Sequence, residues 1–367
     1  MKKVAIIGVT GFGRNHLGNL TRLAEAGRME LAAAVVRTPD RAQQELETLN
    51  KLHSKVYSSA DEFFAAEQGK MDLVCIPTGI NSHEKLTCKA LGAGMNVLLE
   101  KPAAGSVAAV DRMIAARRPG LFAAVAFQHC YAPEIIFFKK LLTSGRLGKI
   151  IRSKVMGIWP RGDAYYSRNV WAAHRTAPDG ELVLDSPVNN AFAHYLNLLL
   201  FLNGAGESAS AHAVSVTGDL MRARPEIEMF DACEAVFTLE NGNPLEILLA
   251  HCSDRLIDPH FRIECANGCI EWNNNADWKV SGKDGVQIAA GTAISPNGGM
   301  FRQILAKLDD PSVPCYTLEN AREHTHCIEL LDKTCKIRDV KAEKEAQNGY
   351  WCVPGLPEHF EERFAQN

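Results

Sequence analysis

Short apolar runs alternate with helical stretches through the first 127 residues of the chain. Six of the runs have the length and composition of strands: Val4–Ile7, Leu31–Val36, Lys55–Tyr57, Leu73–Ile76, Asn96–Leu99 and Leu121–Phe127. Several are uniformly apolar, as strands are when helices cover both faces of their sheet. The alternation therefore predicts an α/β fold with a parallel sheet, whose ligands bind beyond the carboxyl ends of the strands.

A glycine-rich turn joins the first of these strands to the first helix. It reads Gly8-Val9-Thr10-Gly11-Phe12-Gly13 and meets the pattern G-x-G-x-x-G at its two ends, with Thr10 in place of the middle glycine. Glycines let the backbone turn sharply beside a pyrophosphate, whose charge the helix N-terminus stabilises. The turn predicts dinucleotide contacts at Gly8, Thr10, Gly11, Phe12 and Gly13; a plain strand–helix turn is the alternative.

The end of the second strand indicates which dinucleotide is bound. An NAD site usually has an acidic residue there, which binds the ribose 2′-hydroxyl. Here Arg37 and Thr38 follow the strand, and no acidic residue comes before Asp40 in this turn. Arginine makes charge-assisted contacts with phosphate, so these two residues favour NADP over NAD as the cofactor. The alternative is that Arg37 is an ordinary surface arginine.

The stretch from Asp72 to Pro102 carries a more specific pattern. It reads DLVCIPTGINSHEKLTCKALGAGMNVLLEKP: a strand, a Pro-Thr turn, His83 opening a helix, an Ala-Gly helix end, a strand and Glu-Lys-Pro. In this combination the chain resembles the Gfo/Idh/MocA family of oxidoreductases. His16 after the glycine turn and Gln128 after the sixth strand also fit, and the resemblance continues to about residue 335.

The resemblance implies a division into domains. We expect a Rossmann dinucleotide-binding domain at residues 1–127 and a C-terminal α/β domain at residues 128–340, with a large, open, mostly antiparallel sheet. Residues 341–367 are expected to form a C-terminal extension packed on the domains. Strand-like runs between residues 211 and 300 agree with such a sheet. The resemblance also implies a homodimer or homotetramer formed through it.

Further cofactor contacts follow from the resemblance, at Pro77, Thr78, Asn81, His83, Glu100, Lys101 and Gln128. Lys101 matches the family lysine that lies between nicotinamide and substrate, and Pro102 matches a proline that often follows a cis peptide bond. A cationic lysine there lowers the pKa of a reacting hydroxyl and stabilises the developing alkoxide. Without the resemblance, Glu100 and Lys101 would be interpreted as a surface ion pair at the end of a strand.

A loop rich in aromatic and basic residues follows the strand-like run Ile150–Met156. Its side chains suit a polyhydroxylated substrate, which aromatic rings stack on and polar groups bind. The predicted substrate-binding residues in this loop are Tyr166, Arg168, Trp171 and His174. The alternative is that the aromatic residues anchor the loop on the protein body.

The segment from Gly180 to His194 departs from the family's pattern. Many family members have D-x-G-x-H-x-x-D here, and the histidine exchanges a proton with the substrate. Asp185 matches the first aspartate, but Pro187, Asn189 and Phe192 replace the glycine, the histidine and the second aspartate. Asparagine cannot titrate, although it donates and accepts hydrogen bonds. The usual route of proton transfer is therefore in doubt.

Other residues are expected to carry the proton. Asp185 and Lys101 are the first catalytic candidates, with Asn189 orienting the substrate hydroxyl. Asn190 and His194 lie four residues apart on an expected helix and would share one face. Asn190 is predicted to bind substrate, and His194 is the last candidate for the acid or base. A satisfied structural histidine is the alternative for His194.

The composition excludes several classes of partner. A net charge of −3 lacks the basic excess of nucleic-acid-binding proteins. No apolar run approaches the roughly 18 residues that cross a membrane, and no secretion signal is expected. The eleven cysteines are scattered without a C-x-x-C pair, which favours buried thiols in a reducing cytoplasm. His324 and His326 do not share a helical face, so no metal site is predicted.

Together these patterns predict a cytoplasmic NAD(P)-dependent dehydrogenase or reductase. Its substrate is expected to be a sugar, a polyol or a related hydroxylated small molecule, and the cofactor would carry the hydride. One alternative is an NAD-dependent glycoside hydrolase or lyase on the same fold. The other is a cofactor-binding sensor or structural subunit that has lost turnover.

Overall fold

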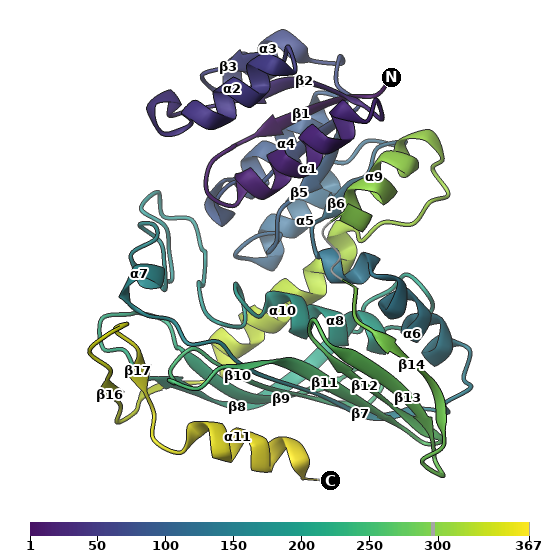
Figure 1. Cartoon of the computed structure of the whole chain (residues 1–367), viewed down its shortest axis with the longest axis vertical. Helices are drawn as coiled ribbons and strands as arrows, with labels where there is room; N and C mark the ends of the chain where they lie inside the picture. Colours follow the sequence, from purple (N-terminus) through teal and green to yellow (C-terminus); the bar gives the residue numbers. More distant parts are fainter. Residues whose placement is uncertain (295–297, 367) are drawn as a thin grey trace. The chain divides into compact units, whose positions relative to one another are not determined.

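Two large sheets organise the chain in the computed structural model, which describes residues 1–294 and 298–366 (Figure 1). They lie in two units, one made of Met1–Tyr131 and Pro296–Arg322 and the other of Ala132–Ser295 and Glu323–Asn367. The predicted division assigned all of residues 128–340 to the second domain. Helix α9 (Gly299–Asp309) belongs instead to the first unit, where the ring of Phe301 packs edge-on against His16 at 5.1 Å.

The sheet of the first unit is parallel, with the strand order β3-β2-β1-β4-β5-β6. Its strands are β1 (Lys3–Ile7), β2 (Glu30–Val35), β3 (Lys55–Tyr57), β4 (Leu73–Ile76), β5 (Asn96–Leu99) and β6 (Ala123–Val125). Every residue of β4 and β6 is buried, as expected for strands covered on both faces. This sheet confirms the predicted Rossmann fold.

Helices connect these strands in the predicted alternation. Besides α9 they are α1 (Gly13–Glu25), α2 (Gln43–Lys51), α3 (Ala60–Glu67), α4 (His83–Gly92) and α5 (Val107–Ala115), with short 3-10 turns η1 (Pro39–Arg41), η2 (Ile80–Ser82) and η3 (Gln128–Tyr131). Serine side chains begin two of the helices. Ser59 accepts a hydrogen bond from the N–H of Glu62 and Ser106 from that of Ala109, each at 3.2 Å, which stabilises the first turn.

The second unit contains a nine-stranded sheet in the order β14-β13-β12-β11-β7-β10-β9-β8-β15. The strands are β7 (Ile150–Ile158), β8 (Ala213–Arg222), β9 (Ala232–Leu239), β10 (Pro244–Ala250), β11 (Ile257–Cys265), β12 (Gly268–Asn273), β13 (Asp277–Gly282), β14 (Gln287–Thr292) and β15 (Ile337–Asp339). Only the pairs β7–β10 and β8–β15 are parallel; the other neighbours are antiparallel. The large, mostly antiparallel sheet confirms the second part of the predicted fold class.

Helices pack on both faces of this sheet. The remaining helices are α6 (Pro133–Thr143), α7 (Asp163–Tyr166), α8 (Ala193–Asn203), α10 (Leu318–Thr334) and α11 (Leu356–Ala365), and a hairpin of β16 (Glu343–Lys344) and β17 (Trp351–Cys352) precedes α11. Side chains of a strand point alternately to its two faces. Along β7, Ser153 accepts a hydrogen bond from Asn203 of α8 at 2.8 Å, whereas the next residue, Lys154, faces α11.

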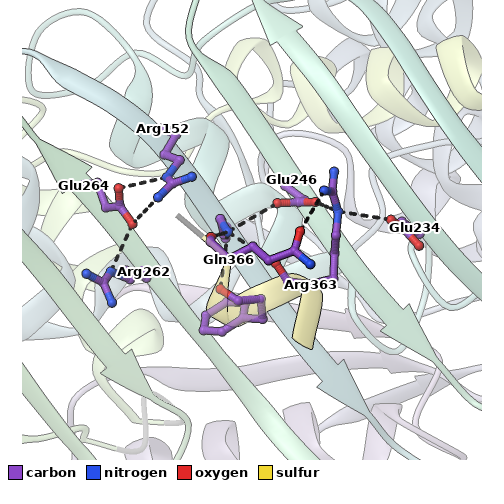
Figure 2. Close-up of polar contacts among 9 residues, drawn as sticks. Arg152, Glu234, Glu246, Arg262, Glu264, Arg363 and Gln366 are labelled. Carbon is purple, nitrogen blue, oxygen red and sulfur yellow. Dashed lines mark hydrogen bonds and ion pairs between the residues drawn. The ribbon is translucent and has the colours of Figure 1, made fainter. Parts of the chain in front are cut away.

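Charged side chains and a small apolar core fasten α11 to the sheet (Figure 2). Lys154, only 4% exposed, donates hydrogen bonds to the carbonyl oxygens of Phe364 and Gln366 at 3.2 and 2.5 Å. The guanidinium of Arg363 lies 2.8 Å from Glu246 and 3.2 Å from Glu234, on neighbouring strands. Because a cation at the end of a helix satisfies its free carbonyl groups, Lys154 stabilises the end of α11.

No helix within residues 1–294 and 298–366 combines the length and apolar character needed to cross a bilayer. The most completely buried helix, α8, has 11 residues. All eleven cysteines are free thiols.

Candidate active site

The predicted cofactor residues of the first unit follow five neighbouring strands. Because the strands are parallel, the carboxyl ends of β2, β1, β4, β5 and β6 form one edge of the sheet. The structure brings to this edge the residues predicted to bind the cofactor: Gly8, Thr10, Gly11, Phe12, Gly13, Arg37, Thr38, Pro77, Thr78, Asn81, His83, Glu100, Lys101 and Gln128. Their roles as contacts stay predictions, which the local geometry supports to different degrees.

The glycine turn after β1 leaves no room for side chains at its two ends. Gly8 has a φ of +93°, and a Cβ there would lie 3.1 Å from the methyl carbon of Thr78. A Cβ on Gly13 would lie 2.4 Å from the carbonyl oxygen of Gly8, closer than two such atoms can approach. The bare backbone at the start of α1 is a cradle that fits a dinucleotide pyrophosphate.

Arg37 and Thr38 are exposed in the turn that follows β2. Thr38 stands directly before η1, whose first acidic residue is Asp40. The guanidinium of Arg37 is exposed at the end of β2 and is accessible to an anionic group of a ligand, because no acidic residue lies between Arg37 and the strand. The turn therefore has the composition of a 2′-phosphate site.

His83 is buried completely, at 0% exposure, and faces backbone carbonyl groups on both sides. Its Nδ1 lies 2.9 Å from the oxygen of Pro102, and its Nε2 lies 3.1 Å from the oxygen of Thr78. Burial lowers the pKa of this imidazole, which favours the neutral form. The structure thus places the ring of His83 between the turns after β4 and β5, and its contact with the cofactor stays a prediction.

Lys101 stands at the end of β5, on a backbone held by its neighbours. One carboxylate oxygen of Glu100 accepts the N–H of Lys101 at 2.8 Å, and the other lies 3.0 Å from Nε2 of His16 on α1. Both His16 and Glu100 are buried, and the peptide bond from Lys101 to Pro102 is cis. The buried pair His16–Glu100 therefore connects the glycine-turn helix to the backbone of the predicted catalytic lysine.

In the second unit, Asp185 gathers three hydrogen bonds although it is only 3% exposed. One carboxylate oxygen accepts Arg168 at 2.8 Å and the N–H of Ala173 at 2.6 Å; the other accepts the amide of Asn190 at 2.7 Å. Burial of a carboxylate is compensated when a cation and several hydrogen-bond donors surround it. The structure thus brings together three predicted residues: Asp185, Arg168 and Asn190.

Two left-handed residues shape the chain around this carboxylate. Ala173 has a φ of 57° and Leu184 a φ of 45°. Side chains other than glycine seldom adopt this conformation, and it is found preferentially at functional sites. Ala173 donates its N–H to Asp185, and Leu184 directly precedes it, so the unusual backbone serves the placement of one carboxylate.

Aromatic rings hold the guanidinium of Arg168 in place. Its central carbon lies 3.8 Å from the ring centre of Tyr165 and 5.5 Å from that of Trp171. These cation–π contacts add to the hydrogen bond that Arg168 donates to the carbonyl oxygen of Tyr165 at 2.8 Å. The arrangement presents a fixed cation, an amide and an indole, which together suit the hydroxyl groups of a sugar or polyol.

Asn189 does not join this cluster. It is 1% exposed, and its amide donates to the carbonyl oxygens of Val183 at 2.9 Å and Leu184 at 3.3 Å. The amide nitrogen thus closes the bend around Leu184, and the role in orienting a substrate hydroxyl stays a prediction.

The predicted common face of Asn190 and His194 is also wrong. Helix α8 begins at Ala193, and residues 187–192 form turns in which the N–H of Phe192 bonds back to Pro187 at 2.8 Å. The residues are therefore not one helical turn apart on a regular helix. His194 lies in the first turn of α8 and is 8% exposed.

The side chains of Tyr166 and His174 have partners other than the carboxylate of Asp185. The ring of Tyr166 lies 4.4 Å from the guanidinium of Arg224, and His174 lies 3.1 Å from the carboxylate of Glu228. Tyr166 thus anchors its loop, which is the alternative that the sequence left open.

Sequence reasoning missed two residues beside the Asp185 cluster. Tyr165 carries Arg168, and His251 of the β10 end stacks on Phe192 at 5.2 Å and lies edge-on to Tyr165 at 5.4 Å. Burial, together with the charge of Arg161, lowers the pKa of His251 to about 3. The three-residue spacing of Tyr165 and Arg168 was a usable signal; no local signal marked His251.

The N-terminal residues match a known family. Residues 2–125 match GFO_IDH_MocA, an oxidoreductase family with an NAD-binding Rossmann fold. The chain is 25% identical over 248 residues to inositol 2-dehydrogenase 2 of Saccharopolyspora erythraea, a match that covers 65% of this chain and 63% of that enzyme. It is 31% identical over 157 residues to glucose-6-phosphate 3-dehydrogenase of Bacillus subtilis, covering 42% of each. The chain therefore spans less than two thirds of the length of these relatives.

Solved structures of similar fold cover more of the chain. The WlbA dehydrogenase from Bordetella pertussis, in complex with NADH and UDP-GlcNAcA, has a TM-score of 0.72 at 19% identity and covers 91% of this chain and 96% of that one. KijD10, a 3-ketoreductase from Actinomadura kijaniata solved with NADP, has a TM-score of 0.71 at 16% identity, covering 92% and 99%. In residues 2–125, the chain is therefore similar to the Gfo/Idh/MocA family of oxidoreductases, whose model describes an NAD-binding Rossmann fold.

Proposed function

We propose that the protein is an NAD(P)-dependent oxidoreductase that transfers a hydride between the nicotinamide and a hydroxyl-bearing carbon of a sugar, a polyol or a related small molecule. The observation that carries this proposal is the edge of the first sheet. There the turn from Gly8 to Gly13, whose two end glycines leave little room for a Cβ, follows β1, and Lys101 follows β5 in the same row of strand ends. The names of the relatives, an inositol and a glucose-6-phosphate dehydrogenase, support this class of substrate.

The chain's own residues would bind, orient and exchange a proton with the substrate. When bound, the cofactor accepts or supplies the hydride. Lys101 stabilises the oxygen of the reacting hydroxyl, because a cation lowers the pKa of that group and favours the alkoxide. In the second unit, Asp185, Arg168 and Asn190 hold a carboxylate, a guanidinium and an amide together, and these groups suit the hydroxyl groups of such a substrate.

The buried amide of Asn189 bears on proton transfer. An amide does not titrate, and this one already donates to two backbone carbonyl groups. We therefore assign the proton to Lys101 first and to Asp185 second, with His194 last.

We further propose that NADP is preferred to NAD. Arg37 and Thr38 are exposed at the end of β2, where an NAD site would have an acidic residue. A guanidinium gains from the 2′-phosphate of NADP a charge-assisted contact that NAD does not offer.

The sheet of the second unit bears on assembly. A homodimer or homotetramer through this sheet stays a prediction. Helix α11 covers part of one face, around Lys154 and Glu246, so any such interface would use the strands beyond it.

The test is a panel of sugars and polyols, incubated with the wild type and NAD or NADP while nicotinamide absorbance is followed. Lys101→Met should lower kcat about 100-fold, because the charge that stabilises the alkoxide is lost. The control Lys51→Met, an exposed lysine at the end of α2, should match the wild type.

Three outcomes would overturn the proposal. Release of a leaving group without net reduction of the cofactor would indicate a glycoside hydrolase or lyase. Tight cofactor binding without turnover across the panel would indicate a sensor or structural subunit. Full activity of Lys101→Met would remove the lysine from the mechanism.

A further inference from the structure

We propose that the C-terminal hairpin of β16 and β17 is a specificity-determining clamp on the substrate loop. It fixes α7 and, through α7, the pair Arg168–Asp185. This inference rests on the proposed function, since it gives the hairpin a role toward the residues of the second unit that are proposed to bind substrate.

The hairpin has a rigid base. Trp351 and Val353 pack against the apolar core beneath α11, and the N–H of Val353 bonds to the carbonyl oxygen of Cys252 at 3.2 Å. The adjoining helix α11 is held in turn by Lys154 and by Arg363, whose ion pairs with Glu246 and Glu234 are drawn in Figure 2. Because its base is fixed in this way, the hairpin is able to restrain the loop that contacts its turn.

The tip of the hairpin is fixed as well. The carboxylate of Glu345 accepts the N–H groups of Gln347 at 2.6 Å and Asn348 at 2.7 Å. Its backbone N–H also bonds to the carbonyl oxygen of Tyr350 at 2.7 Å, which closes the turn. The turn therefore presents the backbone of Asn348 and Gly349 in one conformation.

This turn and α7 are in close contact through two glycines. A Cβ on Gly162, which directly precedes α7, would lie 1.9 Å from the carbonyl oxygen of Asn348. A Cβ on Gly349, whose φ is +68°, would lie 2.5 Å from the carboxylate of Asp163. A side chain on Gly162 would meet the backbone of Asn348, and one on Gly349 would meet the carboxylate of Asp163, so both glycines leave room for the contact between the two segments.

Ionic contacts tie the same two segments together. Arg224, 5% exposed, donates to the carboxylate of Asp163 and to the carbonyl oxygen of Gly349, both at 2.6 Å. Lys344 of β16 lies 3.1 Å from the other carboxylate oxygen of Asp163. The guanidinium of Arg224 also lies over the ring of Tyr166 at 4.4 Å. One buried cation thus joins both ends of α7 to the hairpin.

The path from α7 to the site is short. Tyr165 lies inside α7, its ring carries the guanidinium of Arg168 at 3.8 Å, and Arg168 donates to Asp185 at 2.8 Å. A small displacement of the residues that position a substrate reduces binding and turnover strongly. The hairpin is therefore a positioning element for the polar groups that choose the substrate.

The test compares Gly349→Ala with Gly355→Ala in the full chain. Both glycines lie in the C-terminal extension with positive φ, +68° and +75°, but a Cβ on Gly355 meets nothing within 4 Å. The backbone strain is matched, so only the contact with Asp163 differs. Gly349→Ala should raise KM for the sugar or polyol about 10-fold over the control and leave cofactor affinity unchanged.

A second measurement needs no substrate. Hydrogen–deuterium exchange of residues 161–171 should be about 10-fold faster in Gly349→Ala than in Gly355→Ala. Lys344→Met should show a smaller rise in KM, and Lys344→Arg, which keeps the ion pair, should restore it.

The outcomes separate the two proposals. Exchange at the rate of the control, or faster exchange with an unchanged KM, would overturn the clamp. A wild type that turns over no polyol would instead defeat the proposed function, and the exchange rates would then decide alone whether the hairpin restrains the loop.

Discussion

The two units build their polar sites from different materials. In the first unit the site is largely backbone: a turn from Gly8 to Gly13 and segments that follow neighbouring parallel strands. In the second unit it consists of long side chains, with Arg168, Asp185 and Asn190 drawn together from an irregular loop. The site built of backbone suits the part of a ligand that never changes. The site built of side chains suits the part of a ligand that differs between relatives.

The supports differ in the same way. In the first unit, buried His83 and the pair His16–Glu100 join adjacent turns to one another. In the second unit, the loop depends on residues far away in the chain, such as Arg224. We therefore expect the site built of backbone to lose affinity for its ligand when a methyl group is added. The site built of side chains should lose affinity when a charged group is displaced.

The largest expected effect tests the backbone half of this contrast. Gly13→Ala should weaken cofactor binding about 100-fold, or about 3 kcal/mol, because the added Cβ would lie 2.4 Å from the carbonyl oxygen of Gly8. Gly18→Ala in the same helix is the control, since its Cβ meets nothing within 4 Å. Titration of cofactor fluorescence measures both; equal affinities would contradict the claim that this site is made of backbone.

The next effect concerns the side-chain half and appears as a pH dependence. His251 is buried, and its pKa is lowered from 6.5 to about 3 in the folded chain. Below pH 6.5, His251 is protonated in the unfolded chain but stays neutral in the folded chain. The stability contributed by the neutral ring is therefore lost as the pH falls from 6.5 towards 3. Between pH 7 and 5 the loss should be about 2 kcal/mol.

Urea unfolding of the wild type and His251→Asn at both pH values measures this loss. Asparagine retains a donor for the carbonyl oxygen of Trp159, which His251 contacts at 2.8 Å. The variant should lack this part of the acid sensitivity; identical pH slopes would show that His251 is not held neutral.

The smallest expected effect concerns Arg37, whose proposed contact with the cofactor is made by a side chain although the rest of the site in the first unit is largely backbone. Arg37→Ala should weaken NADP binding about 10-fold, or about 1.4 kcal/mol, with NAD binding unchanged. Arg28→Ala is the control, because Arg28 is exposed before the other end of β2. Equal losses for both cofactors would refute the 2′-phosphate contact and leave Arg37 as a surface residue.

The predictability of each region follows from how local its determinants are. The predicted strands Leu73–Ile76 and Asn96–Leu99 have the observed bounds, because each is an apolar run between turn residues. The glycine turn was likewise predictable, because its glycines are adjacent in the sequence and follow an apolar run. The sequence predicted that the second sheet is large and mostly antiparallel. It did not predict the position of α9, because the contact between Phe301 and His16 joins residues that are far apart in the chain.

Side-chain partners were harder to predict. Asn189 was expected to meet substrate from its place in a pattern, but the left-handed bend at Leu184 turns carbonyl groups towards its amide. His83 was expected to contact the cofactor, and the sequence pattern did not indicate that its ring nitrogens lie beside the carbonyl oxygens of Pro102 and Thr78. Such choices depend on which backbone group arrives beside a side chain after folding, and no local pattern records it.

The buried amine beneath α11 gives the chain an internal reporter. Lysines on a protein surface react readily with acylating reagents. Lys154 is only 4% exposed and donates hydrogen bonds to the end of α11, and burial lowers the pKa of its amine. Its acylation therefore requires the terminal helix to lift from the sheet. Mass spectrometry of that single lysine would time the undocking of the C-terminal segment without any label.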